Sequence, residues 1–376
     1  PAVDLVAYDS AFFKQGRLGL VSAVRACGAA PMEFAPRLVS KTGLLEGIWA
    51  AHLRRGGETD VDSFFREHYW LPRTLRLYHR GDRDMFLKTA PCSGANTQWL
   101  LKKDEHAGKG VIFPDSFDEL RETAELPKTG PNCGSAGEDF QSRVDELMNE
   151  LAAARAAKKK LEDPSTKWLA QEVIEAVRWD VDGTPCRWVV RVYYVVIHRG
   201  AAVCYAGDDL QADGSYDLYV FDRPHAHVYQ KVVSDHELAY SKVDSHRSAA
   251  QMDEAVVKMG GPWNWVESTL MPVAAESARV AFAASQADPA DLEGARVAFL
   301  EARDAYILFA ADFMVDSQFR PFLLEFSSAV EMPPDEDSNT KEQTDLLAWT
   351  VAELVGGSGS PPHWSKVSSR PSLPHP

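Results

Sequence analysis

The chain has 376 residues, of which 45% are hydrophobic, so it can bury a large core and is long enough for two or three packed lobes. Its 40 basic and 55 acidic residues give a net charge of −15, which argues against nucleic acid as a partner. Five scattered cysteines without Cys-x-x-Cys spacing favour a reducing compartment over a disulfide framework, and no apolar run approaches the roughly 20 residues that span a bilayer, so we expect a cytoplasmic protein without a membrane partner.

The N-terminal part alternates short apolar runs with helical patterns, which predicts an α/β lobe. We expect a helix over residues 41–54, and Lys41 at its start is either a solvated charge or a side chain that reaches the site from another lobe. Strands expected at 99–102 and 110–113 flank a polar loop that contains glycine. A loop of this kind can close over phosphate oxygens.

A change of composition marks residues 127–160, where a Pro/Gly/Asn/Ser connector leads into an acidic and then basic helical pattern. We interpret this segment as an insertion. Two strands are expected next, over residues 167–177 and 187–198, with a turn at 180–184 between them. The second strand is almost wholly apolar except for Arg191, so this charge needs a partner or a role.

Two β-rich runs near the C-terminus, at 306–315 and 319–326, are joined by a short polar turn and predict a hairpin. Each run carries an isolated acid, Asp312 in the first and Glu325 in the second. Because an unpaired carboxylate is costly to bury, each acid should meet a cation, a metal or several hydrogen-bond donors. The alternative is an ordinary amphipathic hairpin with its acids at the solvated end.

The order of these features along the chain indicates a nucleotide site. Lys102 and the backbone amides of residues 107–110 would bind phosphates, and Asp312 and Glu325 would hold Mg²⁺, a hard ion that prefers oxygen ligands. Arg191 would form bidentate hydrogen bonds to the γ-phosphate, or to the acyl phosphate made from it.

Two other motifs compete with this reading. A Walker loop is excluded, because Gly110 rather than Ser or Thr follows Lys109. His225 and His227 have the spacing of a metal-binding pair, but histidines near a strand end are more often plain surface or core residues, and we favour that interpretation over zinc.

The chain resembles the tubulin–tyrosine ligase-like family of ATP-grasp ligases in four segments that occur in the family's order. They are YWLPRTLRLYHRGDRDMFL (69–87), QWLLKKDEHAGKGVIF (98–113), WLAQEVIEAVRWDVDGTPCRWVVRVYYVV (168–196) and LFAADFMVDSQFRPFLLEFSSA (308–329). The last segment is the most similar, and the likeness extends over about residues 41–355.

By that resemblance the fold class is α/β (α+β), an ATP-grasp in which two lobes clasp ATP between antiparallel sheets, preceded by a smaller N-terminal α/β lobe. Lys102 and Arg191 would be catalytic, and Mg²⁺ would be held by Asp312, Glu325 and Ser327. The implied ATP-binding residues are Lys102, Gly108, Lys109, Gly110, Gln171, Glu172, Val173, Ile174, Arg187 and Arg191.

The resemblance also implies the reaction, in which ATP phosphorylates a carboxylate and an amine then displaces the phosphate to leave an amide bond. The donor would be an amino acid such as glutamate, glycine or tyrosine, and the acceptor a protein or peptide. Tubulin is the family's acceptor, which would make the location cytoskeletal, but a net charge of −15 suits acidic tubulin tails poorly.

Two departures from the family pattern keep alternatives open. Ser327 stands where the family usually has a metal-binding Asn, and Val189 stands where it has an Asp. They motivate one alternative, a catalytically silent relative that binds ATP or acts as a scaffold. A ligase that joins two small molecules is a second alternative.

The predicted elements suggest four parts of the chain. They are an N-terminal and linker lobe (1–97), a central ATP-grasp lobe (98–200) with the insertion, a C-terminal ATP-grasp lobe (201–355) that carries the hairpin, and a Gly/Ser/Pro tail (356–376). Within the third part we expect a helix at 341–355 and two largely helical stretches, 251–271 and 272–306, which are interrupted at 260–262 and at 288–289. The tail is expected to be disordered.

Overall fold

The computed structural model describes residues 29–31, 38, 40–89, 99–102, 111–112, 168–199, 216–229, 245–286, 304–327, 346–347, 350–351, 353–354 and 361–367. The predicted glycine loop at 107–110 and the predicted insertion at 127–160 lie outside these residues. The chain forms two compact units. Unit 1 comprises Pro1–Leu71, Ile174–Val232 and Ser241–Pro376, and unit 2 comprises Pro72–Val173 and Val233–Tyr240.

Unit 2 contains a four-stranded antiparallel sheet in the order β2-β5-β3-β4. Its strands are β2 (Thr74–Arg76), β3 (Trp99–Lys102), β4 (Val111–Ile112) and β5 (Leu169–Glu172), and helix α6 (Arg80–Thr89) follows β2. The strands predicted on either side of the glycine loop are confirmed, since β3 and β4 pair antiparallel. The predicted strand 167–177 is shorter than expected, because the sheet pairing of β5 ends at Glu172.

A buried ion pair ties α6 to the start of this sheet. Arg76 Nε lies 2.7 Å from Asp82 Oδ2 and Arg76 Nη2 lies 3.1 Å from Asp82 Oδ1, and both residues are buried. The same carboxylate accepts a hydrogen bond from the Arg76 backbone N–H. These bonds satisfy a buried guanidinium and carboxylate, each of which would be costly to bury alone.

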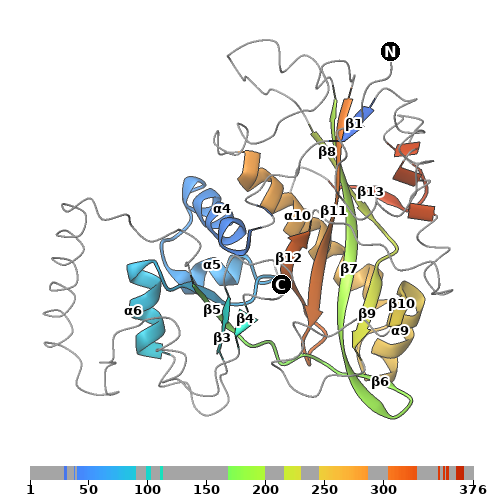
Figure 1. Cartoon of the computed structure of the whole chain (residues 1–376), viewed down its shortest axis with the longest axis horizontal. Helices are drawn as coiled ribbons and strands as arrows, with labels where there is room; N and C mark the ends of the chain where they lie inside the picture. The colour runs from blue at the N-terminus through green and yellow to red at the C-terminus, as the bar shows by residue number, and fades with distance from the viewer. Residues whose placement is uncertain are drawn as a thin grey trace, which may run out of the picture. The chain divides into compact units, whose positions relative to one another are not determined.

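Unit 1 is built on a curled sheet of nine described strands, antiparallel throughout except where β1 pairs parallel with β11. Figure 1 shows the long strand β7 running beside β11 through the sheet. The strands are β1 (Ala29–Pro31), β6 (Trp179–Val181), β7 (Thr184–Arg199), β8 (Tyr216–Phe221), β9 (His225–Tyr229), β10 (Ser245–Ser248), β11 (Asp304–Val315), β12 (Pro321–Ser327) and β13 (Trp364–Lys366).

One face of this sheet carries an aromatic core covered by helices. The helices on this side are α9 (Ala249–Lys258), the π-helical turn η4 (Val266–Leu270) and α10 (Met271–Gln286). Tyr194 of β7 stacks on Phe309 at 4.9 Å, and its hydroxyl donates a hydrogen bond to the carbonyl of Ala274. Farther along β7, Trp188 packs edge-on against Trp265.

Among the described residues, an apolar cluster covers the opposite face at one end of β7. Tyr193, Val195 and Ile197 pack there with Trp364 of β13 and with the helical residues Leu347, Val351 and Leu354. The alternation of side chains along a strand sends every second residue of β7 to this face, so Arg191, Val189 and Arg187 continue it beyond Tyr193. The described part of unit 1 is therefore polar at the end of this face where Arg191 lies.

Helix α4 (Lys41–Arg54) has the bounds that the sequence predicts, and it is followed by α5 (Val61–Glu67). Its N-cap is Ser40, whose hydroxyl accepts a hydrogen bond from the backbone N–H of Gly43 at 2.9 Å. Lys41 is thus the first helical residue, where the helix dipole disfavours a cation. None of the described helices is both long and apolar enough to cross a membrane.

Two expectations about the C-terminal half are wrong. The predicted helix 272–306 ends too late, because β11 begins at Asp304 and pairs with both β1 and β7, which outweighs local helix propensity. The tail 356–376 is not wholly disordered, because Trp364–Lys366 forms β13 on β8. Burial of Trp364 stabilises this strand, and its indole N–H donates to the Thr350 hydroxyl.

We expect Trp364→Ala to lower the free energy of unfolding by about 3–5 kcal/mol, because it empties a buried aromatic site against Phe221. The matched control is Ser365→Ala, an exposed neighbour, with an expected change within about 0.5 kcal/mol. Urea unfolding followed by tryptophan fluorescence and circular dichroism measures both. Equal, small effects would contradict the place of β13 in the core.

Candidate functional site

A row of four polar residues crosses the polar part of the unit 1 sheet. Glu325 of β12 is the register partner of Asp312 on β11, Asp312 is the partner of Arg191 on β7, and Arg191 is the partner of His225 on β9. Residues directly opposite each other in antiparallel strands have side chains on the same face. The predicted hairpin is confirmed, and it brings its two acids together with Arg191.

A β-bulge lies next to this row. The register of β11 with β12 shifts after Asp312, so that Asp312 opposes Glu325 while Phe313 opposes Leu323, and Leu324 is the extra residue. A bulge re-aims the side chains beside it and is common next to functional sites. Here it lets Asp312 and Glu325 share the polar face while Phe313 and Leu323 stay buried.

Arg191 and Asp312 form a bidentate ion pair. Arg191 Nε donates to Asp312 Oδ1 at 2.8 Å, and Nη2 donates to Oδ2 at 2.9 Å. The side chains are only 11% and 14% exposed, so solvent screens the pair weakly. Burial disfavours the guanidinium charge, but the attraction and hydrogen bonds of Asp312 outweigh it, and the pKa of Arg191 is raised above its ordinary value.

Glu325 is the accessible carboxylate of the row. Its side chain is 43% exposed, and Oε2 lies 3.9 Å from Nζ of Lys41, whose position at the start of α4 makes a nearby anion favourable. The sequence left open whether Lys41 reaches the site. The structure places it beside Glu325.

Asp312 and Glu325 suit a shared divalent cation. Directly opposed residues have Cβ atoms about 4.5–5.5 Å apart, a span that one ion can bridge with two carboxylates. Each oxygen of Asp312 accepts a bond from Arg191 but keeps another lone pair for a metal. Ser327 is two residues beyond Glu325, which puts it on the same face, and its hydroxyl is a weaker oxygen donor.

Arg187 extends the basic part of this face. It lies on β7 four residues before Arg191, opposite Tyr229 of β9. Burial and the nearby charge of Arg178 together lower its pKa to about 10. A second guanidinium on this face adds positive charge that an anionic ligand would offset.

The other predicted nucleotide residues lie in unit 2 or at its boundary. Lys102 ends β3 and is buried, opposite Leu169 of β5, and Gln171 of β5 is buried opposite Leu100. Glu172 closes β5, with one carboxylate oxygen 3.6 Å from Nη1 of Arg73. The boundary between the two units falls directly after β5, because Val173 is assigned to unit 2 and Ile174 to unit 1. The remaining predicted residues, Gly108, Lys109 and Gly110, lie outside the described residues.

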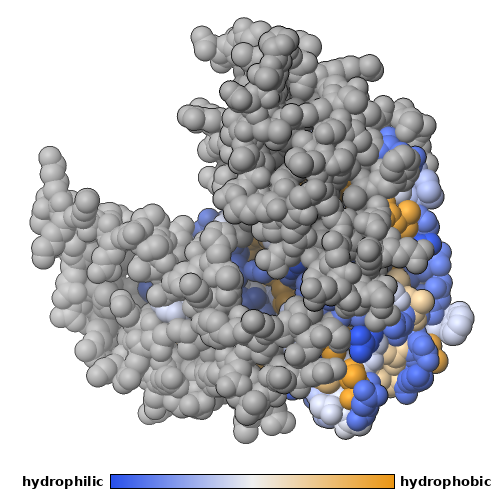
Figure 2. Space-filling model, turned by 45° about the vertical axis from the view of Figure 1, so that its right-hand side comes forward, coloured by the Kyte–Doolittle hydropathy of each residue, from blue (hydrophilic) through white to orange (hydrophobic). Residues whose placement is uncertain are grey.

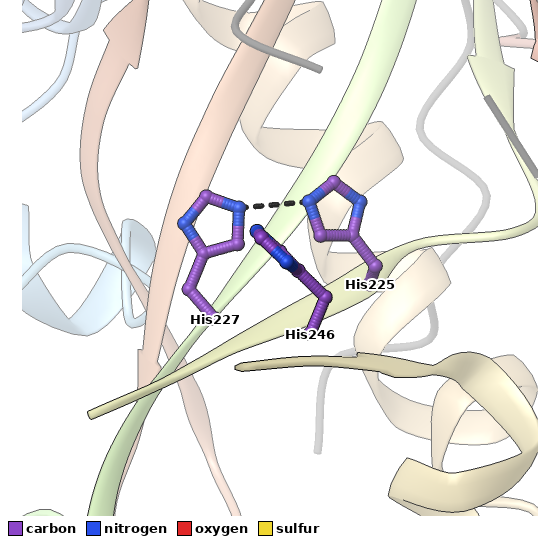
Figure 3. Close-up of side chains that lie close together, drawn as sticks. All are labelled: His225, His227 and His246. Carbon is purple, nitrogen blue, oxygen red and sulfur yellow. Dashed lines mark hydrogen bonds between the residues drawn. The ribbon is translucent and has the colours of Figure 1, made fainter. Parts of the chain in front are cut away.

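A buried histidine cluster includes His225 of the row and lies on the same face. The sequence analysis considered His225 and His227 and favoured plain surface or core residues, and it did not include His246. His225 and His227 alternate on β9, and His246 of β10 is the register partner of His227. All three side chains are buried. Figure 3 shows them close together. The spacing of His225 and His227 was visible in the sequence, but His246 is 19 residues beyond His227 and only strand pairing brings it close.

A second cluster of possible metal ligands lies on α4 and α5 and is already occupied by protein contacts. His52 has one ring nitrogen 2.8 Å from Glu67 Oε2 and the other 3.0 Å from the carbonyl of Glu58. Arg55 Nη2 lies 3.3 Å from Glu67 Oε1. Burial lowers the pKa of His68 to about 4, so its imidazole is neutral near pH 7.

No protein-family model matches the chain, and no curated protein sequence matches it. Function must therefore be inferred from the residues of the site themselves.

Asp312→Ala should lower the free energy of unfolding by about 3–5 kcal/mol, because it leaves the buried guanidinium of Arg191 without its partner. The matched control is Glu325→Ala, which removes an equally charged but half-exposed side chain and should cost about 1 kcal/mol or less. Chemical denaturation measures both.

A double variant distinguishes the loss of the ion pair itself from the cost of leaving Arg191 charged and buried without Asp312. Arg191→Met with Asp312→Leu removes both charges and should recover most of the stability that Asp312→Ala loses. Equal losses in Asp312→Ala and Glu325→Ala would contradict the burial of the pair.

Proposed function

We propose that the chain is an ATP- and Mg²⁺-dependent carboxylate–amine ligase of the ATP-grasp type, related to the tubulin–tyrosine ligase-like family. The observation that carries the proposal is the cross-strand row in which two carboxylates, Glu325 and Asp312, stand beside a bidentate Arg191. Paired carboxylates next to an arginine suit a magnesium-bound phosphate, because the ion and the guanidinium each take phosphate oxygens.

Three residues of the row, together with Arg187, would bind the nucleotide and its metal ion in this proposal. Asp312 and Glu325 hold Mg²⁺, which when bound neutralises charge on the phosphates. Arg191 is fixed in orientation by Asp312, so its guanidinium would hold a set position for charge stabilisation of the transferred phosphoryl group. Arg187, on the same face of β7, adds positive charge for the anionic nucleotide.

The remaining proposed nucleotide residues belong to unit 2 or lie at its boundary. A small antiparallel sheet with β3 and β4 paired at one edge, and with glycines in the sequence between these two strands, is consistent with the phosphate-covering sheet of an ATP-grasp. Lys102 at the end of β3 is the proposed phosphate lysine, and residues 171–174 are the proposed adenine contacts. Gly108, Lys109 and Gly110 would cover the phosphates through backbone amides.

In the proposed reaction a carboxylate oxygen of the acceptor bonds to the γ-phosphorus while the bond from that phosphorus to the ADP oxygen breaks. The amine of the donor then bonds to the acyl carbon, phosphate leaves, and the amine loses a proton. The protein's part in the phosphoryl step would be mainly positioning and charge stabilisation, by Arg191 and Lys102. The donor would be an amino acid such as glutamate, glycine or tyrosine, and the acceptor a protein or peptide.

Calorimetry of ATP binding with Mg²⁺ tests the nucleotide site. Intact chain should bind ATP in a magnesium-dependent manner, and Asp312→Asn combined with Glu325→Gln should weaken binding at least about tenfold, or 1.4 kcal/mol. Glu325→Gln alone keeps the buried ion pair, so it reports on the metal even if the double variant is unstable. Asp217→Asn, which removes a surface carboxylate paired with Lys366, is the matched control.

Magnesium-dependent binding that both hairpin variants leave unchanged would contradict the proposal. ADP release with candidate amino acids and peptides then separates the alternatives. Release that needs a peptide supports a protein ligase, and release with two small molecules supports a small-molecule ligase. Tight ATP binding without any release supports a catalytically silent relative.

A further inference from the structure

We propose that His225, His227 and His246 form a three-imidazole site for a divalent transition metal, with zinc as the ion that this ligand set favours. The site goes beyond the proposed ligase reaction, which uses oxygen ligands and Mg²⁺. Borderline-soft ions such as Zn²⁺ take imidazole nitrogen, whereas Mg²⁺ prefers carboxylate and phosphate oxygens.

The ring nitrogens already converge. His225 Nε2 and His227 Nε2 are 2.7 Å apart, and one nitrogen from each of the three rings lies within 4.8 Å of the others. In Figure 3 the His225 and His227 rings point toward one another from β9, and the His246 ring approaches them from β10. Two nitrogens bound to one tetrahedral zinc are about 3.3 Å apart, so binding requires the first pair to give up its hydrogen bond and to open by roughly 0.6 Å.

The surroundings hold the imidazoles in the neutral, metal-binding form. Burial is the main reason that the pKa values of His225 and His227 lie well below the ordinary value, and the charge of Arg191 acts in the same direction. Protons therefore compete weakly for these nitrogens near neutral pH.

Arg191 would also repel a bound cation, but its charge is balanced by the bidentate contact with Asp312. The ion pair thus lets a metal sit one strand away from a guanidinium. Three protein nitrogens leave a fourth tetrahedral position for water or another donor, the arrangement found in catalytic rather than purely structural zinc sites.

The second cluster, His52, Glu67 and His68, fits a metal less well and serves as an internal control. Its carboxylate is already shared between His52 and Arg55, and a metal would have to displace both contacts. The His225 cluster has no carboxylate, so the two sites differ in the number of imidazoles that a bound metal would have.

Cobalt and zinc titrations of the full chain, after treatment with a chelator, test the proposal. Co²⁺ should give the visible absorption of a four-coordinate nitrogen site, and Zn²⁺ should displace it. His227→Gln and His246→Gln should each weaken zinc binding at least tenfold. His68→Gln in the second cluster is the matched control and should leave the affinity unchanged.

X-ray absorption of the zinc-loaded intact chain provides a readout that needs no variant. Three imidazole ligands are expected at His225, His227 and His246, whereas the second cluster could supply only two. The proposal is overturned if intact chain binds neither ion, if at most two imidazoles coordinate zinc, or if affinity falls only in His68→Gln.

Discussion

The buried ion pair between Arg191 and Asp312 is the interaction on which the polar face of unit 1 depends. It joins the two longest described strands, β7 and β11, at the point where their apolar packing ends. Neither charge is tolerable there alone, because solvent reaches both side chains poorly. In the row, the pair lies between Glu325, which is opposite Asp312, and His225, which is opposite Arg191.

The fold makes room for this pair by dividing the two faces of one sheet. Large aromatic rings and the helices α9 and α10 fill one face, and they hold β7 and β11 in register. On the opposite face the C-terminal residues around Trp364 cover only the apolar end of β7. In Figure 2 hydrophilic residues are interspersed with hydrophobic ones over the part of the described surface that this view shows.

Two sets of possible metal ligands thereby lie on the same face of the sheet, on either side of β7. Oxygen ligands lie on β11 and β12, and nitrogen ligands lie on β9 and β10, with Arg191 of β7 between them. A hard cation such as Mg²⁺ would prefer the oxygen ligands, and a borderline-soft cation such as Zn²⁺ would prefer the imidazole nitrogens. The proposed ligase uses the first set, and the second set is open to a metal whose role would be distinct.

Local signals in the sequence predicted much of this arrangement. The helix 41–54 was expected from its helical pattern, and the hairpin was expected from a polar turn between two apolar runs. The isolated charges of Asp312 and Arg191 in apolar strands indicated a buried contact, and the structure shows that they satisfy one another. This partnership was not predicted, because it depends on the register of strands that are 121 positions apart.

Other features depend on long-range pairing and left no local signal. His246 reaches the histidine cluster only through the pairing of β10 with β9. The strand at Trp364 lies in a Gly/Ser/Pro-rich segment, where composition suggested disorder, and its burial against Phe221 outweighs that composition. Composition and periodicity describe local preference, whereas these residues are placed by tertiary contacts.

The most direct measurement is a crystal structure of the intact chain grown with Mn²⁺ and a non-hydrolysable ATP analogue. Manganese takes the oxygen ligands of magnesium and is located by its anomalous scattering. We predict an anomalous peak bound by Asp312 and Glu325 at about 2.1 Å, with the γ-phosphate beside Arg191. A metal–nucleotide complex bound away from these three residues would contradict the account.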